Sequence, residues 1–533
     1  MKPGAKEQAD GSVVPVPSSP SMSASEREGQ HGMERQFSFF SIIGLAFAIL
    51  NSWTAMAASL NIVLPSGGPV AMLWGLVVSA VGALCLSASL AEICHIYPTS
   101  GGPYHWSAVL SPPEWAPLIS WICGWFAVTG WWALVATAGS LAGSLITGII
   151  ALLHPNYEVQ RWHIFLIFEA WMFGAFFINT FGVRLLPAIN RAALTWSITG
   201  MVVICITCLA CASPNYESGR FVFGGYVNET GWNNGIAWIL GLLQSAFGLT
   251  GFDAVSHIVE EMPDPHIHAP RAMVMAVLIG ATSSFAFLVV LLFCLTDIDA
   301  VISSPAGALL EILYQATSSR AGAVCLLMFP VLSMAFAGQG IMTGASRMTH
   351  AFARDNGLPF SRTFAHINSR FRVPLASLVL TTTLCVIFGC IYLGSSSALN
   401  AILSSSVVAL NVSYSIPVAL LLIRGRHLLH PPDLPSPPTF TLGRVGGPIA
   451  NIIGLAFAVL TTVFFLFPPA LPVTPANMNY TIVVFGIIAL VSITTWITSG
   501  RRNFKGPLDM DELLRIAYEA RRPVGGVQEE KSS

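Results

Sequence analysis

Charged side chains are scarce in this sequence, and their scarcity excludes a water-soluble protein. Of the 533 residues, 10% are Asp, Glu, Lys or Arg, whereas 54% are hydrophobic. Ordinary soluble domains carry about 25% charged residues. A soluble chain of this length would lack the polar groups needed to cover its surface, so the composition favours a protein whose surface faces lipid.

Clusters of chemically reactive residues are also lacking. The formal net charge is −1 and no basic stripe is present, which argues against a nucleic-acid partner. His257, His266 and His268 lie near Glu260 and Glu261, but their spacing matches no standard metal-hydrolase motif. The sequence offers no nucleophile–base pair either. We therefore expect no enzyme activity, no metal and no other cofactor.

A secretory signal is missing from the N-terminus. Residues 1–36 are polar and rich in Ser, Pro and Gly, which predicts a disordered cytoplasmic tail. The first membrane span must then act as its own insertion signal. Residues 501–533 are predicted to form a cytoplasmic C-terminal tail, which leaves 37–500 as the membrane domain.

Long apolar runs are what the sequence has in abundance. A helix that crosses a bilayer needs about 20 mostly apolar residues. Three acidic residues, Glu92, Glu169 and Asp253, fall inside these runs. The pattern predicts an all-α protein with twelve membrane spans, at about 39–63, 69–93, 117–145, 163–181, 190–212, 235–259, 272–296, 321–345, 375–394, 398–423, 447–467 and 480–499.

The basic residues are distributed unequally between the two sides of these spans. With the N-terminus in the cytoplasm, 22 of the 25 Lys and Arg residues lie on the inner side, and only Arg161, Arg220 and Arg320 lie outside. Since inner loops carry an excess of Lys and Arg, this partition predicts that both termini are cytoplasmic. Asn228, in the longest outer loop, begins an Asn-Glu-Thr triplet and is a candidate glycosylation site.

Spans one and six carry polar and flexible residues at their centres. Lipid cannot hydrogen-bond to freed backbone groups, so such interruptions are typical of helices that line a cavity. The two spans lie five apart and cross in opposite directions, and interruptions at matching positions of two inverted halves indicate a binding site at the membrane midplane. The candidate substrate-binding residues are Asn51, Ser52, Trp53, Thr54 and Ala55 in span one, and Phe247, Gly248, Thr250, Gly251 and Asp253 in span six.

Several of these residues have a second interpretation. Asp253 suits a substrate ammonium or a coupling proton, but a carboxylate at a helix exit can also bond to a neighbouring span. Gly248 and Gly251 equally suit close helix packing. Trp125 of span three joins the candidate site because aromatic faces attract ammonium groups, although tryptophans also face lipid.

Acidic and basic residues at the inner ends of the spans are candidates for a gate. Glu92 ends span two, and Glu260 and Glu261 follow span six, while Arg347 and Arg354 lie beyond span eight on the same side. Ion pairs between them would break when an inner gate opens. Ordinary interfacial charges are the alternative.

Short motifs along the chain resemble those of the amino acid–polyamine–organocation transporter superfamily, and above all its fungal branch of choline, γ-aminobutyrate and amino-acid permeases. The resemblance covers about residues 37–500. The motifs are Asn-Ser-Trp at 51–53, Ser-Gly-Gly-Pro at 66–69, Leu-Ala-Glu at 90–92, Tyr-Pro-Thr-Ser-Gly-Gly-Pro-Tyr at 97–104, Gly-Phe-Asp-Ala at 251–254, Pro-Arg-Ala at 270–272 and Ala-Arg-Asp-Asn-Gly-Leu-Pro-Phe at 353–360.

The resemblance implies a five-plus-five inverted repeat, with halves at about 39–212 and 235–423, and two extra spans at about 447–499. It also implies alternating access, with proton-coupled symport in many members and exchange in others. Two departures concern the site: span one has Asn-Ser-Trp-Thr-Ala where relatives often have glycines, and span five lacks the lysine that some members carry.

The expected function is therefore secondary transport of a small amine or amino acid, such as choline or γ-aminobutyrate, coupled to H⁺. A channel is disfavoured because the polar residues concentrate at two helix breaks and do not form a continuous ring. A non-transporting nutrient receptor of the same fold, or an amino-acid/polyamine exchanger, stays open. The expected partners are the substrate and the lipid bilayer, and the expected location is the plasma membrane, with the vacuolar membrane as the alternative.

Overall fold

The computed structural model describes residues 44–507 apart from 45, 48, 155, 395–397, 431–438 and 476. For Glu261 and Ala398 only the backbone is described. The predicted N-terminal tail, and the predicted C-terminal tail from residue 508 onward, lie outside these residues.

The described part of the chain is helical throughout, with one isolated bridge between Ser66 and Asn228. Within it, eleven helices are long and apolar enough to cross a membrane. They coincide with predicted spans two to twelve, so the all-α, multi-span fold is confirmed. In chain order they are α5 (Gly68–Ile96), α7 (Ala116–Leu153), α8 (Arg161–Phe181), α9 (Leu186–Ala212), α11 (Asn234–Gly248) continued by η2 (Phe252–Glu261), α12 (Pro265–Phe293), α15 (Arg320–Arg354), α17 (Leu375–Gly389) continued by α18 (Ile391–Gly394), α19 (Ala398–Arg424), α20 (Gly446–Phe464) and α21 (Thr481–Thr495) continued by η4 (Trp496–Gly500).

The first predicted span, 39–63, lies partly outside the described residues. Its described second half consists of two short helices, α3 (Ser52–Ala58) and α4 (Leu60–Val63), which follow helical residues up to Leu50. This span is therefore interrupted twice within its described part, at Asn51 and at Ser59.

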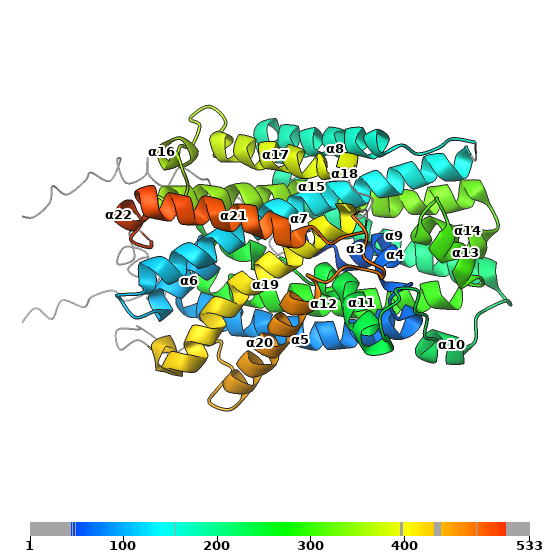
Figure 1. Ribbon diagram of the computed structural model, residues 1–533, viewed down its shortest axis with the longest axis horizontal. Coiled ribbons are helices and arrows are strands. Elements are labelled where there is room, and N and C mark those ends of the chain that lie inside the picture. The colour runs from blue at the N-terminus through cyan, green and yellow to red at the C-terminus, as the bar shows by residue number, and fades with distance from the viewer. Residues whose placement is uncertain are drawn as a thin grey trace, which may run out of the picture.

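Most of the long helices run side by side along the longest axis of the molecule (Figure 1). The short helices α6 (Pro103–Leu110), α16 (Ser361–Phe364) and α22 (Arg501–Asn503) lie at one end, whereas α10 (Gly219–Gly224), α13 (Ile298–Ser303) and α14 (Ala308–Thr317) lie at the other. Because Arg362, Arg501 and Arg502 lie on α16 and α22, we call the first end the basic end.

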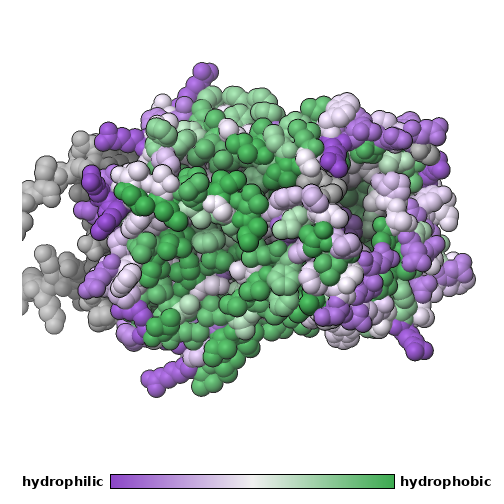
Figure 2. Space-filling model, in the orientation of Figure 1, coloured by the Kyte–Doolittle hydropathy of each residue, from purple (hydrophilic) through white to green (hydrophobic). Residues whose placement is uncertain are grey.

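The surface has the pattern expected of a protein embedded in lipid. Figure 2 shows hydrophobic residues across the middle of the molecule and hydrophilic residues gathered at both ends. Large apolar side chains that would be buried in a soluble protein are exposed on the outer helices, such as Phe181 on α8 (64% exposed) and Leu490 on α21 (68%). The protein is therefore a multi-pass integral membrane protein.

Two helices are much longer than the sequence predicts. α7 has 38 residues and α15 has 35, and at 1.5 Å per residue each exceeds the roughly 30 Å of bilayer hydrocarbon by about 20 Å or more. The predicted span eight ends at residue 345, but α15 continues to Arg354 and ends only where Asn356 takes φ 62°. Arg347 and Arg354 therefore lie on a rigid helical extension, not in a loop.

Candidate functional site

The helix of span one is interrupted at Asn51. Asn51 has φ 40° and ψ 42°, in the left-handed region, and α3 begins anew at Ser52. A helix that begins in this way leaves its first backbone N–H groups without intrahelical partners. Asn51, Ser52 and Thr54 are buried, and Asn51 Nδ2, Ser52 Oγ and Thr54 Oγ1 have no hydrogen-bond partner among the described residues. This cluster of unsatisfied polar atoms is the main feature that indicates a ligand here.

The helix of span six is interrupted at the matching place. α11 ends at Gly248, Leu249 and Thr250 leave helical geometry, and Gly251 takes φ 97° before η2 begins. A glycine adopts that backbone conformation without strain, whereas other residues do so rarely. The chain continues as a 3₁₀ helix, so its backbone hydrogen bonding changes halfway through the span.

The two interruptions lie against each other. A Cβ added at Gly248 would approach Met56 Cγ to 2.6 Å and the Ser52 carbonyl oxygen to 3.3 Å. One turn earlier on α11, Gln244 Nε2 donates a hydrogen bond of 2.7 Å to the Met56 carbonyl oxygen. Gly248 thus permits close helix packing, and this close packing brings the interrupted segments together. The two interpretations of Gly248 are compatible.

The aromatic candidates point to different places. Trp53 is fully buried, donates through Nε1 to Ser197 Oγ at 2.7 Å and packs on Phe287 at a ring distance of 4.8 Å. Trp125 lies close to Phe352 of α15, with 6.1 Å between ring centroids. The tryptophan of α7 that bonds to the residues after the span-six interruption is Trp131, which the sequence analysis did not select.

Three further members of the predicted site are buried beside these segments. Ala55 lies in α3, Phe247 lies one residue before the end of α11, and both are 6% exposed or less. The hydroxyl of Thr250 donates 2.7 Å to the Ala246 carbonyl oxygen, which also accepts from the Leu249 N–H, so this hydroxyl is bound to the end of α11.

Asp253 is bound by the protein's own side chains. It is fully buried; Oδ1 accepts a hydrogen bond of 2.5 Å from the Tyr414 hydroxyl, and Oδ2 accepts one of 3.2 Å from Trp131 Nε1. His257 Nε2 lies 3.1 Å from the same Oδ2. The alternative in which Asp253 bonds to neighbouring spans therefore describes its contacts in this structure. Tyr414 was missed because it is one of many polar residues in span ten.

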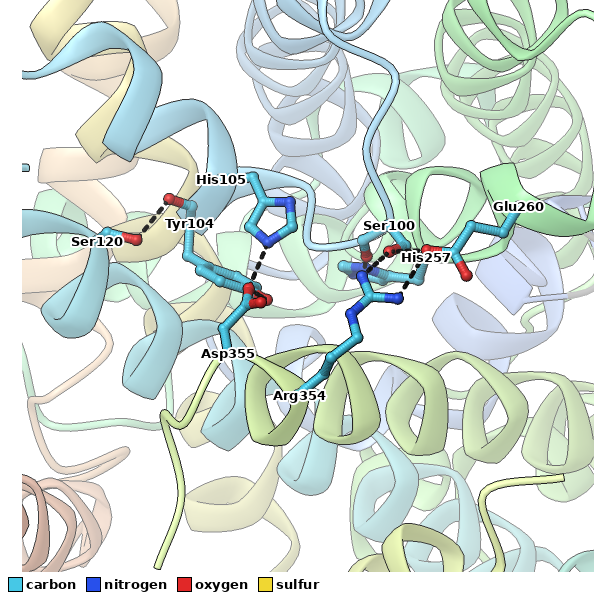
Figure 3. Close-up of polar contacts among 8 residues, drawn as sticks. All are labelled: Ser100, Tyr104, His105, Ser120, His257, Glu260, Arg354 and Asp355. Carbon is cyan, nitrogen blue, oxygen red and sulfur yellow. Dashed lines mark hydrogen bonds and ion pairs between the residues drawn. The ribbon is translucent and has the colours of Figure 1, made fainter. Parts of the chain in front are cut away.

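An ion pair lies at the basic end, beyond the span-six interruption. Arg354 Nη1 lies 3.1 Å from Glu260 Oε1. The hydroxyl of Ser100 links the two, because it donates 2.6 Å to Glu260 Oε1 and accepts 3.1 Å from Arg354 Nη2 (Figure 3). These contacts tie η2, α15 and the segment between α5 and α6 together. We call Arg354, Glu260 and Ser100 the inner cluster.

The other gate candidates lie elsewhere. Glu92 pairs with Arg426 and accepts hydrogen bonds from Thr441 and the Leu442 N–H, so it joins α5 to the segment after α19 and not to α15. Arg347 is buried within α15. The side chain of Glu261 lies outside the described residues.

A second network beside the inner cluster went unnoticed in the sequence. Asp355 caps α15 and accepts hydrogen bonds from the Tyr104 hydroxyl at 2.8 Å and from His105 Nε2 at 2.7 Å (Figure 3). Burial favours the protonated form of Asp355, but His105, the Arg354 guanidinium and the Tyr104 hydroxyl together hold the pKa of this carboxyl below its ordinary value. Asp355 therefore stays charged and fastens α6 to the end of α15.

The opposite end of the molecule is hollowed. A cavity of about 320 Å³ lies between α4, the start of α11 and the start of α19, and its lining includes Asn61, Glu229, Leu243, Asn400 and Ser404. Of the helices that line it, α19 ends at the basic end, where Arg424 bonds to Leu110 of α6, and α11 is continued by η2 to Glu260, so the cavity and the inner cluster lie on opposite sides of the interruptions. Gln244, next to the cavity-lining Leu243, bonds to Met56 of α3.

A membrane-embedded helical bundle with two interrupted helices in contact at its centre is the architecture of a polytopic membrane transport protein. Residues 37–488 match the family model described as amino acid permease, and the chain belongs to this family. The resemblance that the sequence motifs indicated is thereby confirmed.

Curated relatives match the chain over most of its length. It is 35% identical to a choline transporter of Saccharomyces cerevisiae over 92% of this chain and 86% of the yeast protein. It is 36% identical to a putative amino acid/polyamine transporter of Macrophomina phaseolina, over 83% and 96% of the two chains. An amino-acid permease of Arabidopsis thaliana is 30% identical over 94% and 98%.

Proposed function

We propose that this protein is a secondary transporter for a small molecule with an ammonium group, either choline or an amino acid, and that it works by alternating access. The observation that carries the proposal is the contact between the interrupted segments at Asn51 and Gly248, where buried polar atoms of α3 lack partners. The printed names of the relatives, a choline transporter and amino-acid permeases, support this substrate class.

The interruptions provide the chemistry that such a substrate needs. The first N–H groups of α3 suit a carboxylate or hydroxyl group, because the N-terminus of a helix carries partial positive charge. The carbonyl groups freed where α11 ends at Gly248 suit an ammonium group. Asn51, Ser52 and Thr54 would add side-chain contacts, and Phe247 an apolar wall.

The two ends of the molecule differ as alternating access requires. The basic end is closed by the inner cluster, whereas the opposite end holds the cavity lined by Asn61 and Ser404. Ser404, one of the residues that line this cavity, has a buried hydroxyl without a hydrogen-bond partner within the described part of the chain. We propose that the basic end is cytoplasmic, that the cavity opens outward and that the protein resides in the plasma membrane.

Counterflow in proteoliposomes tests the transport function. The purified full-length protein is reconstituted with an excess of one unlabelled compound inside, and uptake of the same labelled compound is followed for choline, γ-aminobutyrate and a panel of amino acids. A carrier produces a transient, saturable accumulation that requires the internal compound. Binding without counterflow for every compound would contradict the proposal and favour a receptor.

A matched pair of variants tests the site. Ser52 Oγ is buried and unpartnered at the interruption, whereas Ser303 Oγ is an exposed hydroxyl of α13. If the interruption holds the substrate, we expect Ser52→Ala to raise the half-saturating concentration roughly tenfold, as loss of about 1–1.5 kcal/mol of one hydrogen bond would do. Ser303→Ala should leave it unchanged.

A further inference from the structure

Asp253 and His257 form a buried pair one helical turn apart on η2. Both side chains are fully enclosed, and Asp253 Oδ2 lies 3.1 Å from His257 Nε2. The other ring nitrogen, His257 Nδ1, lies 2.9 Å from the Ser100 carbonyl oxygen. The pair lies between the span-six interruption and the inner cluster, and the substrate chemistry proposed above does not use it.

These contacts determine how many protons the pair holds. A carbonyl oxygen only accepts hydrogen bonds, so His257 Nδ1 must carry a hydrogen and donate it to Ser100. Nε2 and the carboxylate oxygen then face each other, and both would present lone pairs unless one proton lies between them. That proton belongs either to an imidazolium beside a carboxylate or to a carboxylic acid beside a neutral imidazole. In both forms the pair carries no net charge.

The shared proton keeps this enclosed pair neutral. Removing this proton would leave one uncompensated negative charge in the centre of a membrane protein, which is costly. Tyr414 of α19 donates to Asp253 Oδ1, and Trp131 of α7 donates to Oδ2. η2 also packs on α5, α12 and α15, whose ionisable side chains towards the basic end are Glu92, His95, His266, His268, Arg271, Arg347, His350 and Arg354.

Ser100 connects the pair to the inner cluster. Its backbone carbonyl accepts from His257, while its hydroxyl donates to Glu260 and accepts from Arg354. Figure 3 shows His257 and the Arg354–Glu260 pair converging on this one residue. When the inner cluster opens and Ser100 moves, His257 Nδ1 loses its acceptor and the pair is exposed to the basic end. Both changes alter its affinity for the shared proton.

We propose that the Asp253–His257 pair is the proton-binding site that couples transport to a proton gradient, and that Ser100 links proton release to opening of the inner cluster. A proton taken up from the cavity side binds between Asp253 Oδ2 and His257 Nε2 and leaves to the basic side when the cluster opens. This inference rests on the proposed transport function and adds the coupling ion and its site.

The test uses proteoliposomes of the full-length protein and whichever panel compound gives counterflow with the wild type. An inward proton gradient of one pH unit is imposed with the membrane potential clamped, and lumenal pH is followed with a trapped dye. With one proton carried per substrate, wild type should accumulate the compound about tenfold and acidify the lumen. His257→Gln should lose the gradient-driven accumulation while retaining measurable counterflow.

Glu169→Gln is the matched control, because Glu169 is another buried carboxyl in a span and lies on α8, away from η2. This variant should behave as wild type.

Wild-type counterflow without gradient-driven accumulation or lumenal acidification would overturn the inference and leave the proposed function intact. Loss of coupling in Glu169→Gln but not in His257→Gln would overturn it too. No counterflow in wild type would refute the transport function itself. If His257→Gln lacks counterflow, the decision rests on Asp253→Asn in the same assay and on the lumenal pH of the wild type. Lumenal acidification by the wild type supports the inference, and its absence overturns it.

Discussion

Individual side chains near the basic end show how far a sequence can identify a site. The sequence singled out Asp253, Glu260 and Arg354, and the structure brings the last two into contact. The sequence did not identify the hydrogen-bond and ion-pair partners of these residues, because the partners come from distant parts of the chain. Tyr414 lies 161 residues after Asp253, and Arg426 lies 334 residues after Glu92. Only the three-dimensional packing selects one tyrosine or arginine among several.

The Arg354–Glu260 pair should set how often the basic end opens. Because both side chains are about one-third exposed, the pair stabilises the closed form by at most about 1 kcal/mol, or about fivefold in the ratio of closed to open molecules. We expect Arg354→Ala to raise, by up to that factor, the rate at which a thiol reagent added from the basic side modifies Cys123.

Cys123 suits this measurement because it is fully buried near the start of α7, and mass spectrometry distinguishes its peptide from those of the other cysteines. Arg362→Ala serves as control, since Arg362 lies exposed on α16 at the same end. Equal modification rates in the two variants would show that the ion pair does not hold this end closed.

At the scale of whole helices, the hydrophobicity of the sequence predicts where a spanning helix lies better than it predicts how long that helix is. The apolar runs placed each of these eleven spans on an observed helix, because bilayer thickness sets the minimum run. α7 and α15 were predicted too short, since a helix continues past the lipid as long as its residues permit. The interruptions were predictable because Asn51 and Gly251 are unsuited to a membrane helix interior.

The contact between α3 and α11 depends on the missing side chain of Gly248. A Cβ there would lie 2.6 Å from Met56 Cγ, and forcing a methyl group into such a contact costs about 1–3 kcal/mol. We expect Gly248→Ala to lower both the unfolding temperature of the purified protein and its counterflow rate. The double variant Gly248→Ala/Met56→Ala should be less destabilised than the sum of the two single variants, because it removes the side chain that the methyl group meets.

Gly174→Ala in α8 is the matched control. A Cβ at Gly174 meets nothing within 4 Å, and alanine favours a helix over glycine by about 0.5–1 kcal/mol. This variant should be as stable as wild type or more so. If Gly248→Ala behaves in the same way, the interrupted segments do not depend on close contact.

At the scale of the whole molecule, the two ends carry different residues, and this difference predicts an orientation. The last described helix, α22, lies at the basic end (Figure 1), so the chain leaves the bundle there. Asn228 lies in the loop between α10 and α11, next to Glu229, which lines the cavity at the opposite end. The glycosylation triplet and the last described helix thus lie at opposite ends of the molecule, while the absolute direction is a prediction from charge.

Glycosylation of Asn228 would establish that direction. In the folded protein Asn228 Nδ2 donates to the Trp232 carbonyl oxygen at 2.8 Å and to Asn234 Oδ1 at 3.0 Å, and Oδ1 accepts from the Thr230 hydroxyl. A glycan must therefore be attached before this loop closes. We expect wild type expressed in fungal cells to shift in electrophoretic mobility after glycosidase treatment, and both Asn228→Gln and Thr230→Ala to lack the shift. Asn479→Gln, at a triplet buried beside α21, should keep it. An unglycosylated wild type whose C-terminal tag is reached from outside intact cells would place the basic end outside and reverse the proposed direction of every step.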